Sequence, residues 1–377
     1  MAGIYFHIPF CKKRCNYCDF YKSTDLSFLN SYLKALKSEL VERSNYLSDT
    51  EISTIYFGGG TPSLLSASDI EELISECKNL YNVNKGVEIT LEANPDDLTF
   101  EYLNKIRNVG INRLSIGIQS FSDSDLQFMG RRHTSEQAIN AVKDAQNVGF
   151  NNISVDLIYG IPGMSSDQWN NNLNEVFNLQ IQHISAYHLT YHENTYLWNE
   201  LQKGKIREID EESSLIQFNQ LIEQTLANGF IQYEVSNFAK EDFYSKHNSS
   251  YWKQIEYLGL GPSAHSYNGI SRQWNISDVK KYIELISGKQ IYYEREILSV
   301  NDQFNDYIIT SLRTIWGVNL DLIKQKYGDN YLQHTLDVST GYINSSLVEK
   351  IDNVIRLTKK GIFISDGIIT DFMILES

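Results

Sequence analysis

The sequence has few cysteines and no extended basic tract. Only 4 cysteines occur among 377 residues, too few for the disulfide framework of a small secreted protein. No run of Lys and Arg is longer than Lys12-Lys13-Arg14, and the net charge is −14. The average field therefore repels a phosphate backbone. These shortages argue against a disulfide-rich secreted protein and against a nucleic-acid partner.

Long apolar segments are missing as well. The chain has no uninterrupted run of about 18 apolar residues, the length that indicates a membrane-spanning helix. Its start, Met-Ala-Gly-Ile-Tyr-Phe-His-Ile-Pro-Phe, lacks the basic region of a signal peptide. We therefore expect a cytoplasmic protein in a reducing compartment.

Residues 1–190 alternate short apolar or β-branched runs with helical patterns, which is typical of βα units around a parallel sheet. Apolar residues at helical spacing predict helices between the strands, and Ser68 and Glu71 stand in capping-box register for the helix at 68–80. Cys77 lies on the apolar face of that helix and is interpreted as a core residue. The six predicted strands are 3–8, 53–58, 87–93, 113–119, 152–159 and 183–189.

The pattern changes after residue 205, where a long helix is predicted near 210–228. Shorter, irregular strands follow over 231–267. Further helices are predicted near 277–287, 303–314 and 319–327, ahead of a small helix-and-hairpin module in the tail. We therefore divide the chain into a first domain, 1–215, and a smaller α+β domain, 216–377.

Polar side chains follow the predicted strands at the point where each ends. In a parallel βα array, ligands bind at the carboxyl ends of the strands. The sequence therefore predicts one site at one mouth of the sheet. In chain order, the strand ends carry a cysteine cluster, Gly58-Gly59-Gly60-Thr61, Glu92 with Asn94, Gln119 with Ser120, Asp156, and Tyr187 with His188.

Cys11, Cys15 and Cys18 follow the first strand with the spacing C-x3-C-x2-C. Zinc would usually need a fourth ligand, for which His7 and Asp19 are candidates. A redox pair of Cys15 and Cys18 would leave Cys11 unexplained. A four-iron cluster usually takes four cysteines, so three would leave one iron open to a non-protein ligand.

The cysteine spacing matches the CxxxCxxC signature of the radical S-adenosylmethionine (SAM) superfamily. Other segments resemble its HemN/HemW branch: Tyr-Phe-His-Ile-Pro-Phe-Cys, Phe-Gly-Gly-Gly-Thr-Pro-Ser, Glu-Ala-Asn-Pro, Ile-Gly-Ile-Gln-Ser-Phe, Gly-Arg and Asp-Leu-Ile-Tyr-Gly-Ile-Pro. The resemblance covers nearly the full chain. It implies an α/β fold, a partial (β/α)6 barrel with a smaller C-terminal domain, that holds a 4Fe-4S cluster and SAM.

The resemblance also implies roles for individual residues. Cys11, Cys15 and Cys18 would bind three irons, and SAM would chelate the fourth through its amino and carboxylate groups. If SAM is cleaved, a flavodoxin- or ferredoxin-type donor would supply the electron, giving methionine and a 5′-deoxyadenosyl radical. Residues implied in SAM binding are Tyr5 and Tyr17 beside the cluster, Gly59, Gly60 and Thr61 at the methionyl end, Glu92, Gln119 and Arg131 at the polar ends, Asp156 at the ribose, and Tyr187.

Each of these roles has a plainer alternative. Tyr5 and Tyr17 could be ordinary packing residues, and Arg131, next to Arg132, could be a solvated charge. Glu92 and Asp156 differ from these because they lie in apolar strands, where an unpaired carboxylate is costly. A ligand or a buried arginine partner is therefore required for both.

Two activities compete within the branch. HemN-type oxygen-independent coproporphyrinogen III oxidases carry a fourth cysteine two positions after the third and an N-terminal extension. Here Phe20 stands at that position, and only ten residues precede Cys11. Both departures favour the HemW type, haem chaperones that bind haem, hand it to membrane acceptor proteins and lack the oxidase activity. The alternatives are the porphyrinogen decarboxylase, whose activity is not expected, and a structural zinc protein.

The segment His247-Asn248-Ser249-Ser250-Tyr251-Trp252 resembles the HNxxYW motif that the family associates with haem binding. It offers an imidazole for axial ligation and two aromatic rings for a porphyrin face, so His247, Tyr251 and Trp252 are implied haem residues. A structural or surface role is the alternative for His247. His265, in a Gly-rich loop, could line the same cavity.

The partners implied by the resemblance are haem, haem-accepting respiratory membrane proteins and the electron donor. Nucleic acid is not expected. The chain could form a homodimer and could contact the membrane peripherally during haem transfer.

Overall fold

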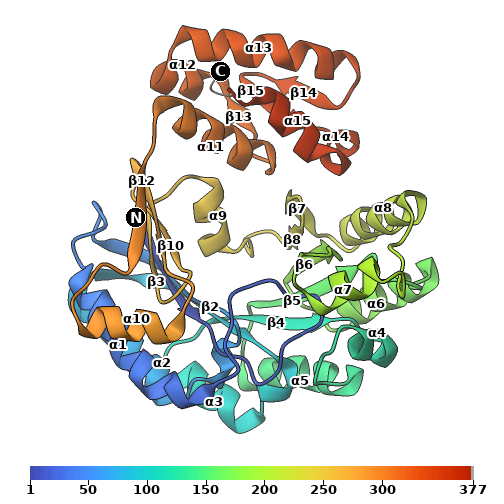
Figure 1. Ribbon diagram of the computed structural model, residues 1–377. Coiled ribbons are helices and arrows are strands. Elements are labelled where there is room, and N and C mark those ends of the chain that lie inside the picture. Colours follow the sequence, from blue (N-terminus) through green and yellow to red (C-terminus); the bar gives the residue numbers. More distant parts are fainter. Residues whose placement is uncertain (375–377) are drawn as a thin grey trace.

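The computed structural model describes residues 1–374. Its main feature is a 12-stranded sheet in the order β12-β11-β10-β9-β1-β2-β3-β4-β5-β6-β8-β7. The sheet is curved, with helices on its outer side (Figure 1). Six parallel strands form its centre, which confirms the predicted α/β fold. They are β1 (Ala2–Ile8), β2 (Glu51–Gly59), β3 (Asn82–Ala93), β4 (Arg113–Gln119), β5 (Ile153–Tyr159) and β6 (His183–His188).

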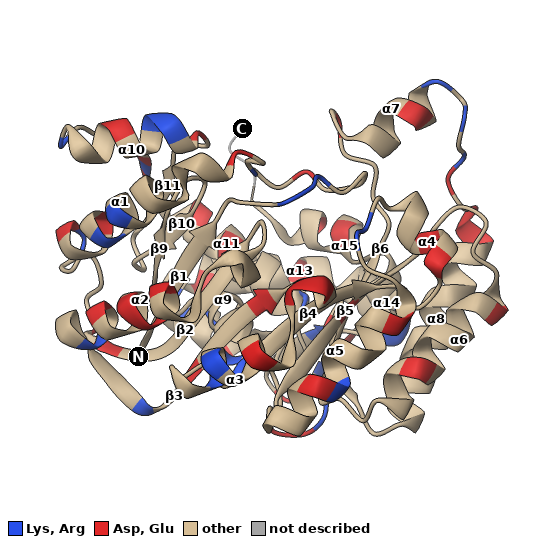
Figure 2. Cartoon of the chain, turned by 90° about the horizontal axis from the view of Figure 1, so that it is seen from below, with Lys and Arg blue, Asp and Glu red and all other residues tan. Residues whose placement is uncertain are grey.

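Helices connect consecutive parallel strands, as parallel pairing requires. They are α1 (Leu29–Glu42), α2 (Ala67–Leu80), α3 (Phe100–Asn108), α4 (Asp123–Phe128), α5 (Ser135–Val148) and α6 (Ser166–Asn178), with 3-10 turns at Leu26–Phe28, Pro62–Leu64 and Pro95–Asp97. Asp and Glu are spread along these outer helices among fewer Lys and Arg (Figure 2). The outside of the barrel therefore carries much of the negative charge.

In helix α2 one prediction from the sequence is wrong and another is confirmed. The predicted capping box of Ser68 and Glu71 is wrong, because the helix begins at Ala67 and its capping box is formed by Ser66 and Asp69. Two overlapping S-x-x-acid patterns start two residues apart, and local sequence does not distinguish them. Cys77 is fully buried in the core, as predicted.

The sheet continues beyond the six parallel strands on both sides. β8 (Asn237–Ala239) pairs antiparallel with β6, and β7 (Ile231–Glu234) follows it. On the other side β9 (Tyr257–Leu260) pairs parallel with β1, followed by antiparallel β10 (His265–Tyr267), β11 (Ser271–Asn275) and β12 (Tyr293–Ile297). The helices of this part are α7 (Tyr196–Gln202), α8 (Glu211–Ala227), α9 (Lys246–Trp252) and α10 (Val279–Ser287).

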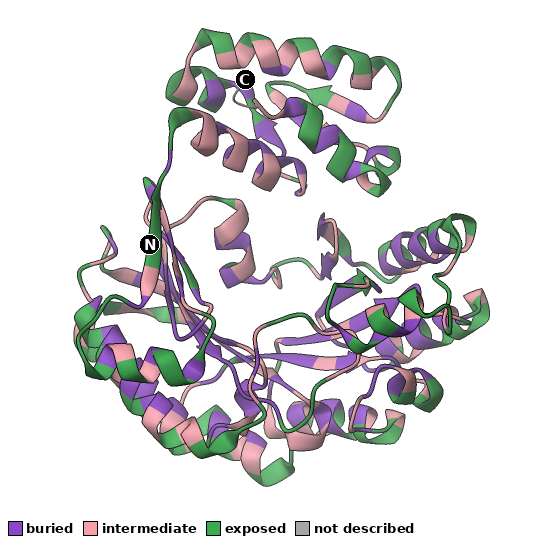
Figure 3. Ribbon diagram, viewed as in Figure 1, coloured by how far each residue is buried: buried purple, intermediate pink, exposed green. Residues whose placement is uncertain are grey.

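A second apolar cluster begins at Phe304 and ends at Phe372. It lies among α11 (Val300–Leu312), α12 (Leu320–Tyr327), α13 (Asp329–Asn344), α14 (Lys359–Phe363), α15 (Ser365–Phe372) and a small sheet of β13 (Val318–Asn319), β15 (Val354–Leu357) and β14 (Val348–Ile351). Figure 3 shows buried residues facing one another within this module. The boundary placed at residue 215 stays a prediction.

The long sheet strands carry the larger apolar core, which extends from Ala2 to Tyr292. Within residues 1–374, none of the helices has both the length and the apolar character that crossing a bilayer takes.

Candidate functional site

The cysteine loop follows β1 and is fixed by backbone hydrogen bonds. The Cys11 amide donates to the Ser23 carbonyl over 3.0 Å. Asn16 holds the middle of the loop against the end of α4, because its amide donates to the Met129 carbonyl at 2.9 Å and its Nδ2 donates to the Phe128 carbonyl at 2.7 Å. The three cysteines are therefore held on a loop with defined contacts at both ends.

Two polar side chains contact the thiols, one just after β2 and one between α4 and α5. Thr61 Oγ1 lies 3.4 Å from Cys11 Sγ, and Arg131 NH1 lies 3.4 Å from Cys15 Sγ. Asn94 connects the two donors, since its Nδ2 donates to Thr61 Oγ1 at 3.2 Å and its Oδ1 accepts from Arg131 NH2 at 2.6 Å. This network links the cysteine loop to the ends of β2 and β3 and to the segment between α4 and α5.

The geometry of the cysteines bears on the kind of metal site. All three are free thiols, and burial raises the pKa of Cys11. Over the described range 1–374, no three His, Cys, Asp or Glu side chains converge closely enough to hold a single metal ion. In a polynuclear cluster each of the three thiolates would bind a different iron.

The glycine turn after β2 allows the backbone to approach the cysteine loop. A Cβ on Gly60 would lie 2.8 Å from the Phe10 carbonyl oxygen and 3.0 Å from Cys11 Sγ. Gly59 has a φ of 108°, in the left-handed region that glycine adopts most readily. Its amide donates to Glu92 Oε2 at 3.1 Å. Glycine is thus required at both positions for the cysteines and Glu92 to come this close.

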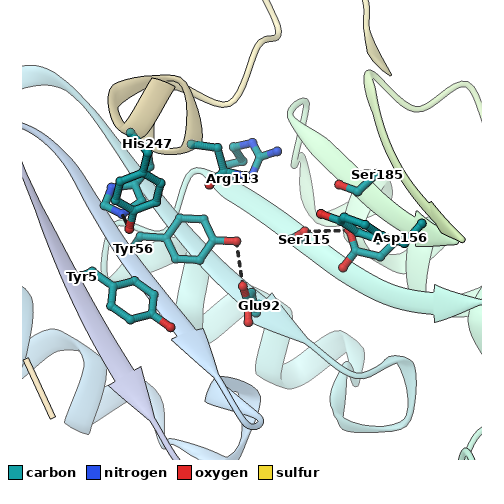
Figure 4. Close-up of a pocket in the computed structure, with 11 residues that line it drawn as sticks. Tyr5, Tyr56, Glu92, Arg113, Ser115, Asp156, Ser185 and His247 are labelled. Atoms are coloured by element: carbon teal, nitrogen blue, oxygen red, sulfur yellow. Dashed lines mark hydrogen bonds between the residues drawn. The ribbon is translucent and has the colours of Figure 1, made fainter. Parts of the chain in front are cut away.

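A cavity of about 270 Å³, which we call the central cavity, opens at the carboxyl ends of the parallel strands. Figure 4 shows its side chains pointing inward from several strands and from α9. Four of the predicted SAM residues and two of the predicted haem residues line the same space. The lining residues are Tyr5, Tyr56, Glu92, Arg113, Ser115, Asp156, Ser185, Tyr187, His247, Asn248 and Tyr251.

The two carboxyls of this cavity have raised pKa values. Burial raises the pKa of Glu92 to about 7 and that of Asp156 to about 6. Tyr56 donates its hydroxyl hydrogen to Glu92 Oε1 at 2.8 Å, and Ser115 donates to Asp156 Oδ1 at 3.2 Å. Without a ligand Glu92 is about half protonated near pH 7 and Asp156 is mostly ionised. A cationic ligand would favour the ionised form of both.

Arg113 is a cavity residue that the sequence patterns missed. It is 1% exposed, and its Nε and NH1 atoms have no hydrogen-bond partner among residues 1–374. Its charge lowers the pKa of both Glu92 and Asp156. The only signal for it in the sequence is an arginine that opens an apolar strand. A buried guanidinium without a close partner gives the cavity an electrostatic bias toward negative charge.

The other predicted SAM residues do not line the central cavity, and Thr61 and Arg131 contact thiols. Arg131 NH2 also donates to the Gly117 carbonyl at 2.6 Å, and burial raises the pKa of the neighbouring Tyr17. These contacts disfavour a solvated Arg131. Gln119, with a φ of 70°, ends β4 beside Gly117.

His247 is buried in the wall of the cavity, on α9. Its Nδ1 lies 2.8 Å from Thr54 Oγ1, and its Nε2 lies 2.7 Å from the Tyr251 hydroxyl oxygen. Glu88 of β3 fixes the start of this helix by accepting hydrogen bonds from the amides of Lys246 and His247. In this conformation neither ring nitrogen is free, so iron ligation by His247 would require the release of one partner.

Trp252, the third predicted haem residue, does not line the central cavity. It lies at the end of α9, and the guanidinium of Arg313 sits 5.9 Å from its ring centroid. Its Nε1 is buried without a hydrogen-bond partner among residues 1–374.

Comparison with known proteins gives consistent results. The family model described as "Radical SAM superfamily" matches residues 5–176. The chain is 32% identical over 376 residues to a Bacillus subtilis protein named heme chaperone HemW, with 99% of each chain covered. It is 31% identical over 370 residues to the Lactococcus lactis protein of that name, with 98% of this chain and 97% of the relative covered.

A solved structure shares the fold. The coproporphyrinogen III oxidase HemN from Escherichia coli superposes with a TM-score of 0.85 over 99% of this chain and 90% of its own, at 23% identity.

Proposed function

This chain belongs to the HemW family of the radical SAM superfamily, and from that premise we propose that it is a haem chaperone that transfers haem to acceptor proteins. The observation that carries the proposal is the similarity, over nearly the full length, to proteins named heme chaperone HemW. Phe20, where HemN-type oxidases have a fourth cysteine, supports the same choice.

Membership of the superfamily implies a 4Fe-4S cluster and SAM, and the residues fit both. Cys11, Cys15 and Cys18 supply three thiolates, and the lack of a Cβ at Gly60 lets the turn after β2 lie against Cys11. When bound and reduced, the cluster supplies the electron for reductive cleavage of SAM.

The protein's own groups would position SAM. Glu92 and Asp156 offer carboxylates to a cationic amino group and to ribose hydroxyls. Arg131 would hold Cys15 and Asn94 in place. The other residues that we assign to SAM are Tyr5, Tyr17, Gly59, Gly60, Thr61, Gln119 and Tyr187.

Delivery requires partners that are part of the proposal. We assign haem-accepting membrane proteins as recipients and a flavodoxin- or ferredoxin-type protein as the reductant. The chain would act in the cytoplasm and touch the membrane only during transfer. A homodimer would be one arrangement for that step.

The decisive experiment is a spectroscopic haem titration of the anaerobically reconstituted protein, with and without SAM. We expect a saturable Soret band. A protein that carries its cluster and yet gives no saturable band would contradict the chaperone assignment.

Two further assays separate the alternatives. Anaerobic incubation with coproporphyrinogen III, SAM and a reductant should give no decarboxylated product, whereas product would indicate an oxidase. A brown, oxygen-sensitive preparation is expected, and a colourless protein with stoichiometric zinc would favour a structural zinc site instead.

A further inference from the structure

A second cavity of about 490 Å³ lies next to the central cavity. We call it the outer cavity. Tyr5 and Tyr251 line both cavities, so the two are neighbours across these two rings. The outer cavity is bounded by β1, the cysteine loop, β9 to β11 and α11, and it is larger than the central one. Tyr5 is the one residue assigned to SAM that also lines the outer cavity.

Aromatic rings make up much of the wall of the outer cavity. Tyr251 packs edge-on against Tyr257 with ring centroids 4.6 Å apart, and Tyr257 is 6.4 Å from Tyr267. Phe20 also lines the cavity and is 67% exposed. Exposure of a large phenylalanine ring to water costs free energy, and an apolar ligand that covers the ring removes this cost.

Two histidines line this cavity. The Nε2 of His7 is buried, and its Nδ1 lies 3.1 Å from the Tyr5 hydroxyl oxygen, whereas His265 is exposed. Neither of its ring nitrogens has a hydrogen-bond partner within the described part of the chain, and its ring is exposed. The ring stacks on Trp274 with centroids 6.3 Å apart, which orients it. Partial desolvation of the ring and the charge of Arg272 lower its pKa, so the ring is neutral near pH 7 and can donate a nitrogen lone pair.

Arg272 places positive charge on the same wall. It lines the cavity and forms ion pairs of 3.2 Å with Asp306 and with Glu296. Its Nε is buried and has no partner among residues 1–374. An anionic group at the rim could therefore share this arginine with the two carboxylates.

We propose that the outer cavity is the haem site, with His265 as the axial ligand of the iron and Phe20 against the porphyrin face. A flat aromatic ring system with a metal at its centre and carboxylates at its edge suits aromatic walls, a free imidazole and a rim arginine. The proposal rests on the proposed function. It differs from the motif-based assignment of His247, whose two ring nitrogens are occupied.

The test is a haem titration of the full-length, cluster-loaded protein and its His265→Ala variant, followed at the Soret band. We expect the variant to bind haem about tenfold more weakly or worse, with a shifted Soret band that returns when imidazole is added to the buffer. His247→Ala should keep the parental band position. Cluster absorbance and circular dichroism verify that each variant is loaded and folded.

A second pair of variants tests the porphyrin face. Phe20→Ala should weaken haem binding about fivefold, in the range of a lost aromatic contact. Phe100→Ala removes an exposed ring on α3 that does not line the cavity, and it should bind like the parent.

The titrations separate a wrong haem site from a wrong chaperone function. If the parent itself binds no haem, the chaperone assignment fails. If the parent binds haem and His265→Ala gives the parental spectrum and affinity, the outer-cavity assignment is wrong while the chaperone assignment stands.

Discussion

The Nε2 atom of His247 lies 2.7 Å from the hydroxyl oxygen of Tyr251, one helical turn further along α9. Thr54 occupies the other ring nitrogen at 2.8 Å, and the ring stacks on Tyr56 with centroids 4.9 Å apart. Burial lowers the pKa of His247 to about 3, so the ring stays neutral. The motif that resembles a haem-binding signature therefore forms part of the wall between the central and outer cavities.

Tyr251→Phe should destabilise the fold by about 1–3 kcal/mol, because it leaves a buried imidazole nitrogen without its partner. The free energy of unfolding in urea measures this. Tyr257→Phe is the matched control, since its ring packs on Tyr251 but its hydroxyl has no hydrogen-bond partner among residues 1–374. Equal losses in the two variants would show that the hydrogen bond to His247 contributes nothing.

The Glu92→Gln variant should become more stable than the parent protein as pH rises. The carboxyl pKa is about 7 in the ligand-free fold and about 4.3 in an unfolded chain. Between these values the folded state keeps a proton that the unfolded state has released, so the parent's free energy of unfolding falls with increasing pH. The glutamine does not titrate, so the variant's free energy of unfolding does not fall for this reason.

By pH 8 the free energy of unfolding of Glu92→Gln should exceed that of the parent by about 2 kcal/mol. Urea unfolding from pH 5 to pH 8 measures this difference. Glu101→Gln is the control, because Lys105 lowers that carboxyl's pKa and no gain is expected over this range. A pH-independent difference for Glu92→Gln would contradict the raised pKa.

SAM affinity should increase from pH 6 to pH 8, because a cationic ligand requires Glu92 and Asp156 to be ionised. Arg113 lowers both pKa values, so Arg113→Gln should raise them and move the binding profile to higher pH. Calorimetric titrations of reconstituted protein at three pH values test this. Arg107→Gln, on the exposed side of α3, should leave the profile in place, and an identical shift there would refute the role of Arg113.

Arg131→Gln should impair cluster binding because the guanidinium contacts Cys15 Sγ, Asn94 and the Gly117 carbonyl together. Loss of such a supporting contact typically lowers metal-site affinity about 10–100-fold. Iron content and visible absorbance after reconstitution are the measurements. Arg132→Gln removes the adjacent arginine, which pairs with Asp96, and should retain the cluster. Similar iron contents in both variants would exclude a special role for Arg131.

Cys11→Ala should abolish the cluster, whereas Cys77→Ala should keep it and lose about 1 kcal/mol of stability from the buried thiol. Iron analysis and urea unfolding separate the two effects. Retention of a full cluster in Cys11→Ala would remove this residue from the ligand set.

Much of the barrel could be predicted because its signals are local. The six parallel strands lie where β-branched runs predicted them, and Cys77 lies on the apolar face of α2. The flanking strands were harder, since β9 gains its place by pairing Gly3 with Tyr257, which are far apart in the chain. Short strands of this kind have little periodicity of their own, and long-range pairing decides them.

The sequence by itself determined the three thiols of the cysteine loop, the carboxyls at the strand ends and the family. Only the tertiary structure decided that His247 is occupied by Thr54 and Tyr251, that Arg113 faces Glu92 and Asp156, and that His265 and Phe20 border one cavity. The reason is physical: spacing in the chain fixes which groups are present, but packing of distant segments fixes which hydrogen bonds are already made. A motif can therefore identify a histidine without showing whether its nitrogens are free.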